Sequence, residues 1–241
     1  MPQPTQAHPP THRPHASEAP ERGTPNLPSA SSELASLKIR LHQSIRQFPD
    51  FPAPGVLFED ILPLFSDPTL HEAFIRALEL HIHTNYAEAE RPELVLGLEA
   101  RGFLFGPSLA LRLGAGFVPV RKQGKLPGPT ETASYQKEYG QDFFQIQTDA
   151  IKPGQKVLVV DDIIATGMGH VLIARKLTNT RKGGSAAAAG SLVRKLGGNL
   201  LGYVFILELD FLKGRDELDA PVYTLLSSQP DGFGKNSHEK T

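Results

Sequence analysis

The sequence predicts an α/β fold, with a mostly parallel, twisted sheet flanked by helices. Short apolar runs, typical of strands buried on both faces, alternate along the chain with segments whose apolar residues recur every three or four positions. The chain has 241 residues, 39% of them hydrophobic, which suits one soluble domain with disordered ends or at most two small domains. Alternating strands and helices indicate a parallel sheet covered on both faces.

The first segment of the chain is a low-complexity extension. Residues 1–32 are rich in Pro, Ser, Thr and His, so they cannot bury enough apolar surface to offset their ordering entropy, and we predict that they are disordered. Ser32 is predicted to cap a helix at 33–47, and a second helix is predicted at 69–83. Between these helices, FPDFPAPGVLFED is a proline-broken extended segment.

The rest of the folded domain, predicted over 33–228, alternates strongly. Strands are predicted at 93–99, 116–122, 143–147, 156–162, 203–209 and 221–226, with helices at 104–113 and 185–196. Residues 123–141 contain three glycines and two prolines among scattered charges, a composition typical of a long mobile loop. Residues 229–241 are predicted to form a flexible C-terminal tail.

Charge and composition exclude several classes of function. The formal net charge of −1 argues against a dedicated nucleic-acid-binding or membrane-surface protein, since both usually carry a basic excess. The absence of cysteine excludes disulfides and cysteine-based metal sites or nucleophiles. No run approaches the roughly 20 apolar residues that span a bilayer, and the N-terminus lacks the apolar core of a secretory signal. We therefore expect a cytoplasmic protein.

Polar residues gather where three predicted strands end. In open parallel sheets, ligands bind beyond the carboxyl ends of the strands. The polar groups that follow these strands are Glu99 and Arg101, Arg121 and Lys122 (with Lys125 nearby), and Asp161 and Asp162. Two carboxylates suit vicinal sugar hydroxyls, and the basic groups suit a polyanion. An aspartate pair alone could instead bind Mg²⁺, as in a signalling receiver domain, or simply be solvated.

The turn after the aspartates adds a phosphate site. Ala165, Thr166 and Gly167 offer backbone N–H groups and a hydroxyl close to a predicted helix, which is a favourable arrangement for a phosphate. Taken together, the strand ends indicate a site for a phosphorylated sugar that carries a further phosphate group.

These motifs resemble a known family. VLVVDDIIATG is similar to the ribose-phosphate signature of the type I phosphoribosyltransferases. FPDFPAPGVLFEDILPLF, GLEARGFLFGPSLA, VPVRKQGKLPGPT, SYQKEYG and ELDFLKGR together resemble adenine phosphoribosyltransferases, with a fungal character, over about 33–228. The resemblance implies a small N-terminal hood, a mobile catalytic loop, and a homodimer. It also implies the reaction of adenine with 5-phosphoribosyl 1-pyrophosphate (PRPP) to AMP and pyrophosphate, with Mg²⁺ carried by PRPP and no metal ligand from the protein.

The resemblance also assigns roles to residues. Asp161 and Asp162 would hold the ribose hydroxyls, and Ala165, Thr166 and Gly167 would begin the 5′-phosphate loop. The residues expected to meet PRPP or its pyrophosphate are Arg101, Arg121, Lys122, Lys125 and Tyr139. Cations stabilise the departing pyrophosphate, so Arg101 is also a catalytic candidate, and Glu138 would be the carboxylate that manages the purine proton.

The hood is expected to hold the base. Adenine would stack between Phe58 and Ile163, with Val56 nearby. Many relatives carry a basic residue after that phenylalanine, whereas this chain has Glu59, so the side-chain contact of that position does not carry over.

The phosphate loop departs from the family pattern. The family continues from ATG through G-S/T directly into its helix, whereas here residues 168–183 intervene before Gly184 and Ser185. A phosphate nest needs N–H groups from consecutive residues, so we predict impaired PRPP binding. In one reading the insert loops out, and Gly184 and Ser185 complete the nest. In a second, GMGHVLIARKL replaces the loop. In a third, the sixteen residues are the translation of a retained intron, because the possible codons for these residues permit splice-like signals.

Other functions stay open at this point. A related enzyme could act on a 6-oxopurine or pyrimidine base, although the LPGPT–SYQKEYG loop and the FPDFP hood argue against it. The chain could also be a catalytically impaired, PRPP-binding paralogue or sensor. A sensor would usually need a nucleic-acid-binding module, and the Pro-rich extension supplies no helix-turn-helix.

Overall fold

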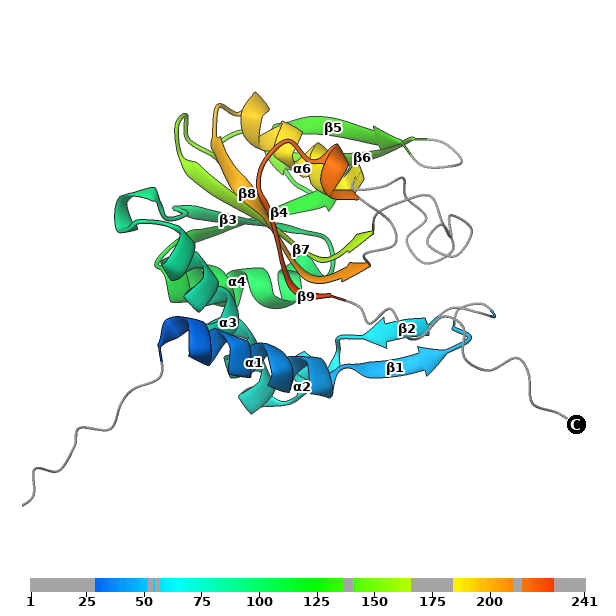
Figure 1. Cartoon of the computed structure of the whole chain (residues 1–241). Helices are drawn as coiled ribbons and strands as arrows, with labels where there is room; N and C mark the ends of the chain where they lie inside the picture. The colour runs from blue at the N-terminus through cyan, green and yellow to red at the C-terminus, as the bar shows by residue number, and fades with distance from the viewer. Residues whose placement is uncertain are drawn as a thin grey trace, which may run out of the picture.

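The fold is built around one large sheet and one small sheet (Figure 1). The computed structural model describes residues 29–51, 54, 57–136, 141–165, 184–209 and 214–227. In chain order the elements are α1 (Ala30–Ser44), β1 (Arg46–Pro49), β2 (Leu57–Asp60), α2 (Pro63–Ser66), α3 (Pro68–Asn85), η1 (Glu88–Glu90), β3 (Leu94–Leu98), α4 (Gly102–Leu113), β4 (Gly116–Lys122), β5 (Thr130–Gln136), β6 (Gln141–Gln147), β7 (Lys156–Ala165), α6 (Gly184–Lys195), β8 (Asn199–Leu209), η3 (Gly214–Glu217) and β9 (Val222–Ser227).

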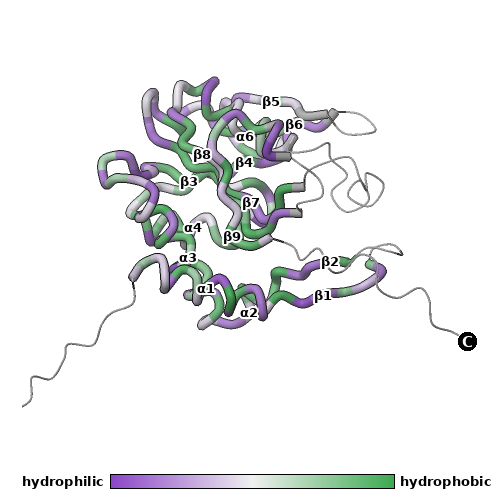
Figure 2. The backbone as a smooth tube through the Cα atoms, viewed as in Figure 1, coloured by the Kyte–Doolittle hydropathy of each residue, from purple (hydrophilic) through white to green (hydrophobic). Residues whose placement is uncertain are grey.

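The large sheet confirms the predicted fold class. Its strand order is β5-β6-β4-β3-β7-β8-β9. The five strands from β4 to β9 in this order pair in parallel, while β6 runs antiparallel to both β4 and β5. Helices α1, α3 and α4 cover one face and α6 covers the other, as Figure 1 shows. The hydrophobic strands lie between these layers (Figure 2).

Apolar periodicity accounts for the helical layer formed by α1 and α3. Leu41 in α1 is buried in the core on this side of the sheet, as are Phe74, Leu78 and Ile82 in α3, which recur at every fourth position. The cap was placed wrongly, however. Ser29, not Ser32, is the N-cap, and its hydroxyl accepts a hydrogen bond from the Ser32 amide (3.2 Å). Serines in this stretch are equally good caps by type, so the sequence did not identify which one begins the helix.

Other boundaries shift by a few residues. Helix α1 ends at Ser44 rather than at 47, because the chain enters β1 at Arg46. Strand β8 begins at Asn199, four residues before the predicted start, and β4 has the predicted bounds. Within the described part of the chain, no helix has the length and apolarity needed to cross a bilayer.

The predicted loop at 123–141 is wrong over much of its length. Residues Thr130–Gln136 form strand β5, which pairs with β6 in an unbroken antiparallel register. Strand β5 lies at the edge of the sheet, where polar side chains are tolerated. Of its residues 130–134, whose burial is described, only Ala133 belongs to the core. Its polar sequence therefore hid the strand. Residues 137–140 lie outside the described residues.

The proline-broken segment forms the small hood sheet. Strands β1 and β2 pair antiparallel, with Phe48 opposite Phe58 and Gln47 opposite Glu59. Arg46 forms an ion pair with Asp60 across the hairpin (2.5 Å). This hairpin projects beside the carboxyl edge of the large sheet (Figure 1). The predicted extensions at 1–28 and 229–241 lie outside the described residues.

Candidate active site

Strand order brings the predicted polar groups to one edge. Strands β4, β3 and β7 are direct neighbours, with Leu98 opposite Val120 and Gly97 opposite Val160. Because the three strands are parallel, the residues that follow these pairs emerge at the same edge. The sequence prediction that three strand ends would converge there is confirmed.

Gly102 allows the helix after β3 to approach β7 closely. A Cβ atom on Gly102 would lie 2.7 Å from the carbonyl oxygen of Val160, a distance that real contacts do not show. The close approach starts α4 directly beside β7 and places Arg101 against the aspartate pair. The Arg101 guanidinium forms an ion pair with Oδ2 of Asp162, linking the ends of β3 and β7.

Asp161 and Asp162 form a tightly coupled acidic pair. Asp162 is 3% exposed, and its backbone N–H donates to Oδ1 of Asp161 (3.0 Å). Burial raises the pKa of the Asp161 carboxyl well above its usual value, and the negative charge of Asp162 raises it further. Burial also raises the pKa of Asp162, although the Arg101 charge opposes that shift. A ligand that donates hydrogen bonds would relieve this cost.

The basic residues gather around another carboxylate, that of Glu99. Its backbone N–H donates to the carbonyl of Val120 (3.0 Å), which aligns Glu99 with the end of β4. Oε1 of Glu99 accepts from Arg121 Nη2 (3.1 Å) and from Lys125 Nζ (2.8 Å). Oε2 accepts from the Lys122 backbone N–H (3.2 Å). The sequence placed Glu99 among the strand-end groups but assigned it no role.

The phosphate loop is described only at its two ends. Ala165 is the last residue of β7, and Gly184 and Ser185 are the first residues of α6. Backbone N–H groups at a helix start carry partial positive charge and attract phosphates, so Gly184 and Ser185 are of the right type. Thr166, Gly167 and the insert at 168–183 lie outside the described residues.

The hood carries an aromatic pair. Phe58 of β2 meets Phe51 edge-to-face, with ring centroids 5.2 Å apart and planes at 78°. Ile163 of β7 is partly buried against the core that also includes Ile61. Glu59 is buried and accepts a hydrogen bond from Gln47 (3.3 Å). Burial raises the pKa of Glu59, and the Gln47 contact opposes the rise.

Besides Thr166 and Gly167, three more predicted site residues lie outside the described part of the chain: Val56, Glu138 and Tyr139. Their assignments stay predictions. The described residues contain no group of three or more His, Cys, Asp or Glu side chains that could hold a metal ion. The basic strand-end cluster is instead suited to an anion.

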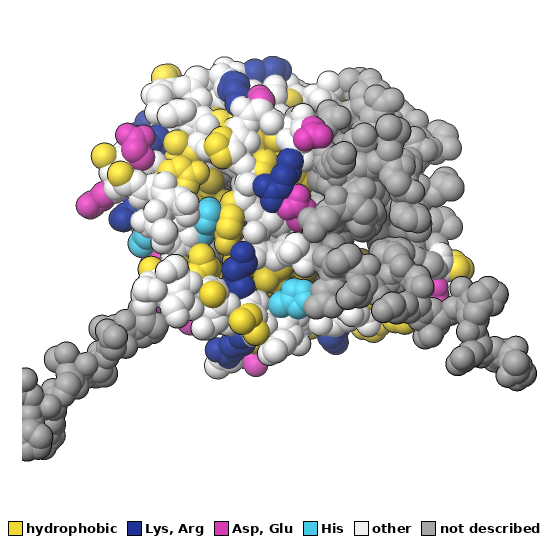
Figure 3. Space-filling model, viewed as in Figure 1, with side chains coloured by type: hydrophobic (Ala, Val, Ile, Leu, Met, Phe, Trp, Pro, Cys, Tyr) yellow, Lys and Arg dark blue, Asp and Glu magenta, His cyan; other side chains and the backbone are white. Residues whose placement is uncertain are grey.

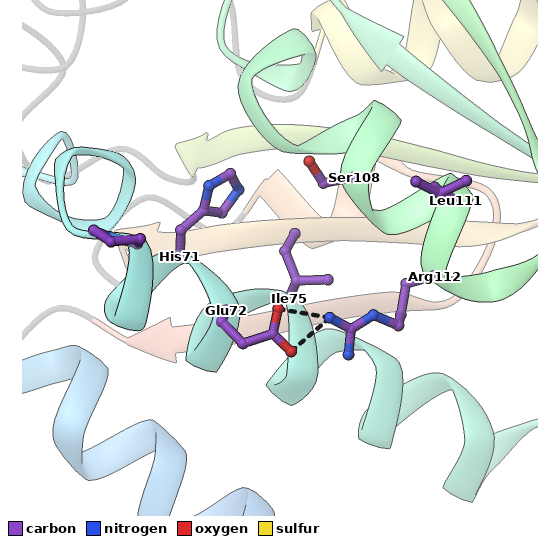
Figure 4. A pocket seen from close by; sticks show the side chains of 7 residues that line it. His71, Glu72, Ile75, Ser108, Leu111 and Arg112 are labelled. Atoms are coloured by element: carbon purple, nitrogen blue, oxygen red, sulfur yellow. Dashed lines mark hydrogen bonds and ion pairs between the residues drawn. The ribbon is translucent and has the colours of Figure 1, made fainter.

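Two cavities lie apart from this edge. One of about 460 Å³ separates α3 from α4, and Glu72 and Arg112 form a two-pronged ion pair beside it (2.5 and 2.6 Å; Figure 4). The other, about 560 Å³, lies between α1 and the ends of β8 and β9. Neither is lined by a predicted site residue. On the face seen in Figure 3, charges of both signs are interspersed over the described surface.

Comparison with known proteins agrees with this geometry. A family described as the phosphoribosyl transferase domain matches residues 69–177. Adenine phosphoribosyltransferase of Yarrowia lipolytica is 56% identical over 81% of this chain and 98% of its own length. The Mus musculus relative of the same name is 46% identical over 76% of this chain and 92% of its own length.

Solved structures match the fold as well. The Saccharomyces cerevisiae adenine phosphoribosyltransferase, solved with adenine and an imino-altritol bisphosphate, has a TM-score of 0.70 and 52% identity. The match covers 80% of this chain and 99% of that one. The enzyme from Rhodothermus marinus has a TM-score of 0.65 and 42% identity, over 80% of this chain and 99% of its own.

Proposed function

This chain belongs to the adenine phosphoribosyltransferase family, and we propose that it transfers the phosphoribosyl group of PRPP to adenine, forming AMP and pyrophosphate. The observation that carries the proposal is the convergence of the aspartate pair with the cations at the carboxyl edge of β3, β4 and β7. One end of this edge suits sugar hydroxyls and the other suits a polyanion, which are the two ends of PRPP.

The proposed reaction exchanges one bond at the ribose for another. A bond forms between a purine ring nitrogen and C1 of the ribose, and the bond from C1 to the pyrophosphate oxygen breaks with its electron pair leaving on pyrophosphate. Arg101, Arg121, Lys122 and Lys125 stabilise that developing charge. In this proposal the proton on the reacting nitrogen passes to the carboxylate of Glu138, and Tyr139 would contact the pyrophosphate.

Mg²⁺ enters this scheme as part of the substrate, bound to the phosphates of PRPP, where it offsets negative charge on the leaving group. Asp161 and Asp162 accept hydrogen bonds from the ribose hydroxyls, which stabilises their buried charges. Ala165, Thr166, Gly167, Gly184 and Ser185 would surround the 5′-phosphate.

For the base, we propose a sandwich between Phe58 and Ile163, with Val56 close to its edge. The edge-to-face contact from Phe51 supports this role, because it fixes the plane of the Phe58 ring. Glu59 is buried and bonded to Gln47 on the hairpin, so we assign it no contact with the base. A cytoplasmic location and a homodimeric assembly complete the proposal.

The test is PRPP-dependent conversion of labelled adenine to AMP, with guanine and hypoxanthine as competing bases. We expect adenine to be used and the 6-oxopurines to compete poorly. AMP formation that fails in a folded protein which still binds PRPP would favour a non-catalytic sensor. Preferential use of guanine would support a different transferase of the same fold.

One specific observation favours the sensor alternative, namely the interruption of the phosphate loop by residues 168–183. A chain lacking 168–183 rejoins Gly167 to Gly184 and restores the contiguous pattern. We propose that this shortened chain is the more active one, because a phosphate nest uses consecutive N–H groups. Equal activity of both chains would show that the insert loops away from the phosphate. A genomic sequence without splice-like signals would exclude the retained intron.

A further inference from the structure

Glu99 stands at the centre of the basic end of the site. Its carboxylate contacts three residues of the β4 end at once: the Arg121 guanidinium, the Lys125 ammonium and the Lys122 backbone N–H. Arg121 also reaches Oε2 of Glu99 through Nε (3.4 Å) and donates from Nη1 to the carbonyl of Lys125 (3.2 Å). These contacts close a ring that joins β3, β4 and the turn after β4.

The surroundings keep this carboxylate charged. Its side chain is only 14% exposed, and burial alone would favour the neutral acid. The hydrogen bonds from Arg121 and Lys125 outweigh burial and hold the pKa of Glu99 at about 2. Glu99 is therefore an anion at neutral pH.

A fixed anion among cations could act in either of two directions. It could compete with an incoming polyanion for the same donors and weaken binding. Alternatively, it could hold side chains that otherwise repel one another in the geometry that the polyanion needs. The two effects predict opposite changes in polyanion affinity when the charge of Glu99 is removed.

Donor counting decides between these directions. Hydrogen bonds to other described residues use three of the five N–H donors of Arg121 and one of the three of Lys125. Donors are thus left over for a ligand while Glu99 stays in place. A pyrophosphate also carries several negative charges against one on Glu99, so it need not displace the carboxylate to attract these cations.

We propose that Glu99 is a positioning residue, which orders the Arg121 and Lys125 side chains into a preformed cradle for the pyrophosphate group. This inference rests on the proposed function, since it deepens the role of the same site. We assign Glu99 no contact with the reacting atoms, because it acts through the cations that it holds.

Strand β3 supplies a matched control at its other end. Glu93, just before β3, accepts from the Lys156 backbone N–H (2.9 Å) and lies 3.6 Å from Lys156 Nζ. Like Glu99, it accepts a hydrogen bond from one backbone amide and forms an ion pair with a lysine, but its side chain is 51% exposed and it lies at the edge opposite the site.

The experiment titrates magnesium pyrophosphate into the full chain by calorimetry, with Glu99→Gln, Glu99→Asp and Glu93→Gln beside the wild type. We expect Glu99→Gln to weaken binding about tenfold, because a charge-assisted contact to each cation is lost. Glu99→Asp keeps the charge and should recover part of the affinity, and Glu93→Gln should bind as the wild type does. Melting temperatures measured on the same samples separate a loss of order at the site from general unfolding.

Equal or tighter binding by Glu99→Gln would overturn the inference and make Glu99 a competing anion. If Glu99→Asp does not recover the lost pyrophosphate affinity, and both Glu99 variants melt at a lower temperature than the wild type, Glu99 only stabilises the fold. A wild-type chain that makes AMP while Glu99→Gln is unchanged overturns this inference alone. A wild-type chain that binds no pyrophosphate overturns the proposed function with it.

Discussion

Glu99 and the Asp161–Asp162 pair are carboxylates at the same edge of one sheet, yet their surroundings shift their pKa values in opposite directions. Glu99 accepts from two cationic side chains and one amide, and its pKa falls to about 2. The aspartates lie side by side with Arg101 as their charged partner, and burial raises the pKa of both.

The carboxylate of Glu99 has its hydrogen-bonding and charged partners within the protein, whereas the aspartate pair has too few of them. The Glu99 carboxylate has its hydrogen bonds made before any ligand arrives, and its two cationic partners leave a net positive charge for an anion. The aspartate pair keeps excess negative charge in a buried place, which is the arrangement expected where a ligand must supply the missing hydrogen bonds. We therefore expect the pyrophosphate end of the proposed site to be preformed and the ribose end to be completed by its substrate.

The largest expected effect comes from removing a charge from the aspartate pair. Asp161→Asn should lower kcat/KM for PRPP by about 100-fold, because hydrogen bonds from the ribose hydroxyls to a charged acceptor are lost. The same variant should melt at a higher temperature, since a buried repulsion is removed. Steady-state kinetics and thermal melts test both signs, and a variant that is less stable as well as less active would contradict the comparison.

The pH dependence of this stability gain follows from the raised pKa. A carboxyl whose folded pKa lies above its unfolded value makes the wild type lose stability as pH rises from the unfolded value toward the folded one. The stability advantage of Asp161→Asn should therefore be small below about pH 4, the ordinary aspartate range, and should grow as pH rises. Denaturant titrations across pH measure it, and an advantage that shrinks with rising pH would show that the pair is not strained.

A smaller effect is expected where the two regions are joined. Gly102→Ala places a Cβ 2.7 Å from the Val160 carbonyl oxygen, so α4 must move away from β7 and carry Arg101 from Asp162. Overpacking of this kind costs about 1 to 3 kcal/mol of unfolding free energy, and KM for PRPP should rise. Leu104→Ala, an exposed position on the same helix, is the control. Unchanged KM in Gly102→Ala would show that the helix position does not matter.

The smallest effect concerns the base. Phe51→Leu removes the edge-to-face partner of Phe58, an interaction worth about 1 kcal/mol, so KM for adenine should rise a few-fold while KM for PRPP stays constant. Phe51 is 54% exposed, so little stability should be lost. Phe143→Leu, at another partly exposed aromatic residue in β6, provides the comparison. Equal changes in the KM values for adenine and PRPP would show that Phe51 does not act specifically on adenine binding.

Much of this site could be predicted from the sequence because its groups follow strongly apolar strands. Runs such as LVLGL and VLVV predict buried parallel strands, and the polar residues that follow these strands must then lie at the same edge of the sheet. The polar edge strand β5 escaped prediction, because nothing in its composition separates it from a loop. The sequence also could not identify Ser29 rather than Ser32 as the N-cap, because the two serines are equally good caps and lie close together.

The role of Glu99 could not be predicted for a different reason. Sequence shows that a glutamate ends β3, but not that its carboxylate lies among the cations that end the neighbouring strand. That fact depends on the register between β3 and β4, which is a tertiary property. The contact between Gly102 and Val160 is also tertiary, and a glycine at the start of a helix gave no signal of it.

The most direct measurement titrates two ligands, magnesium pyrophosphate and ribose 5-phosphate, into the full chain and into the chain lacking 168–183. If the cradle is preformed and the ribose-phosphate end depends on a contiguous loop, pyrophosphate will bind both chains with equal affinity. Ribose 5-phosphate will then bind measurably only to the shortened chain. Pyrophosphate binding that appears only after the deletion would contradict the account, because the two ends of the site would then form together rather than separately.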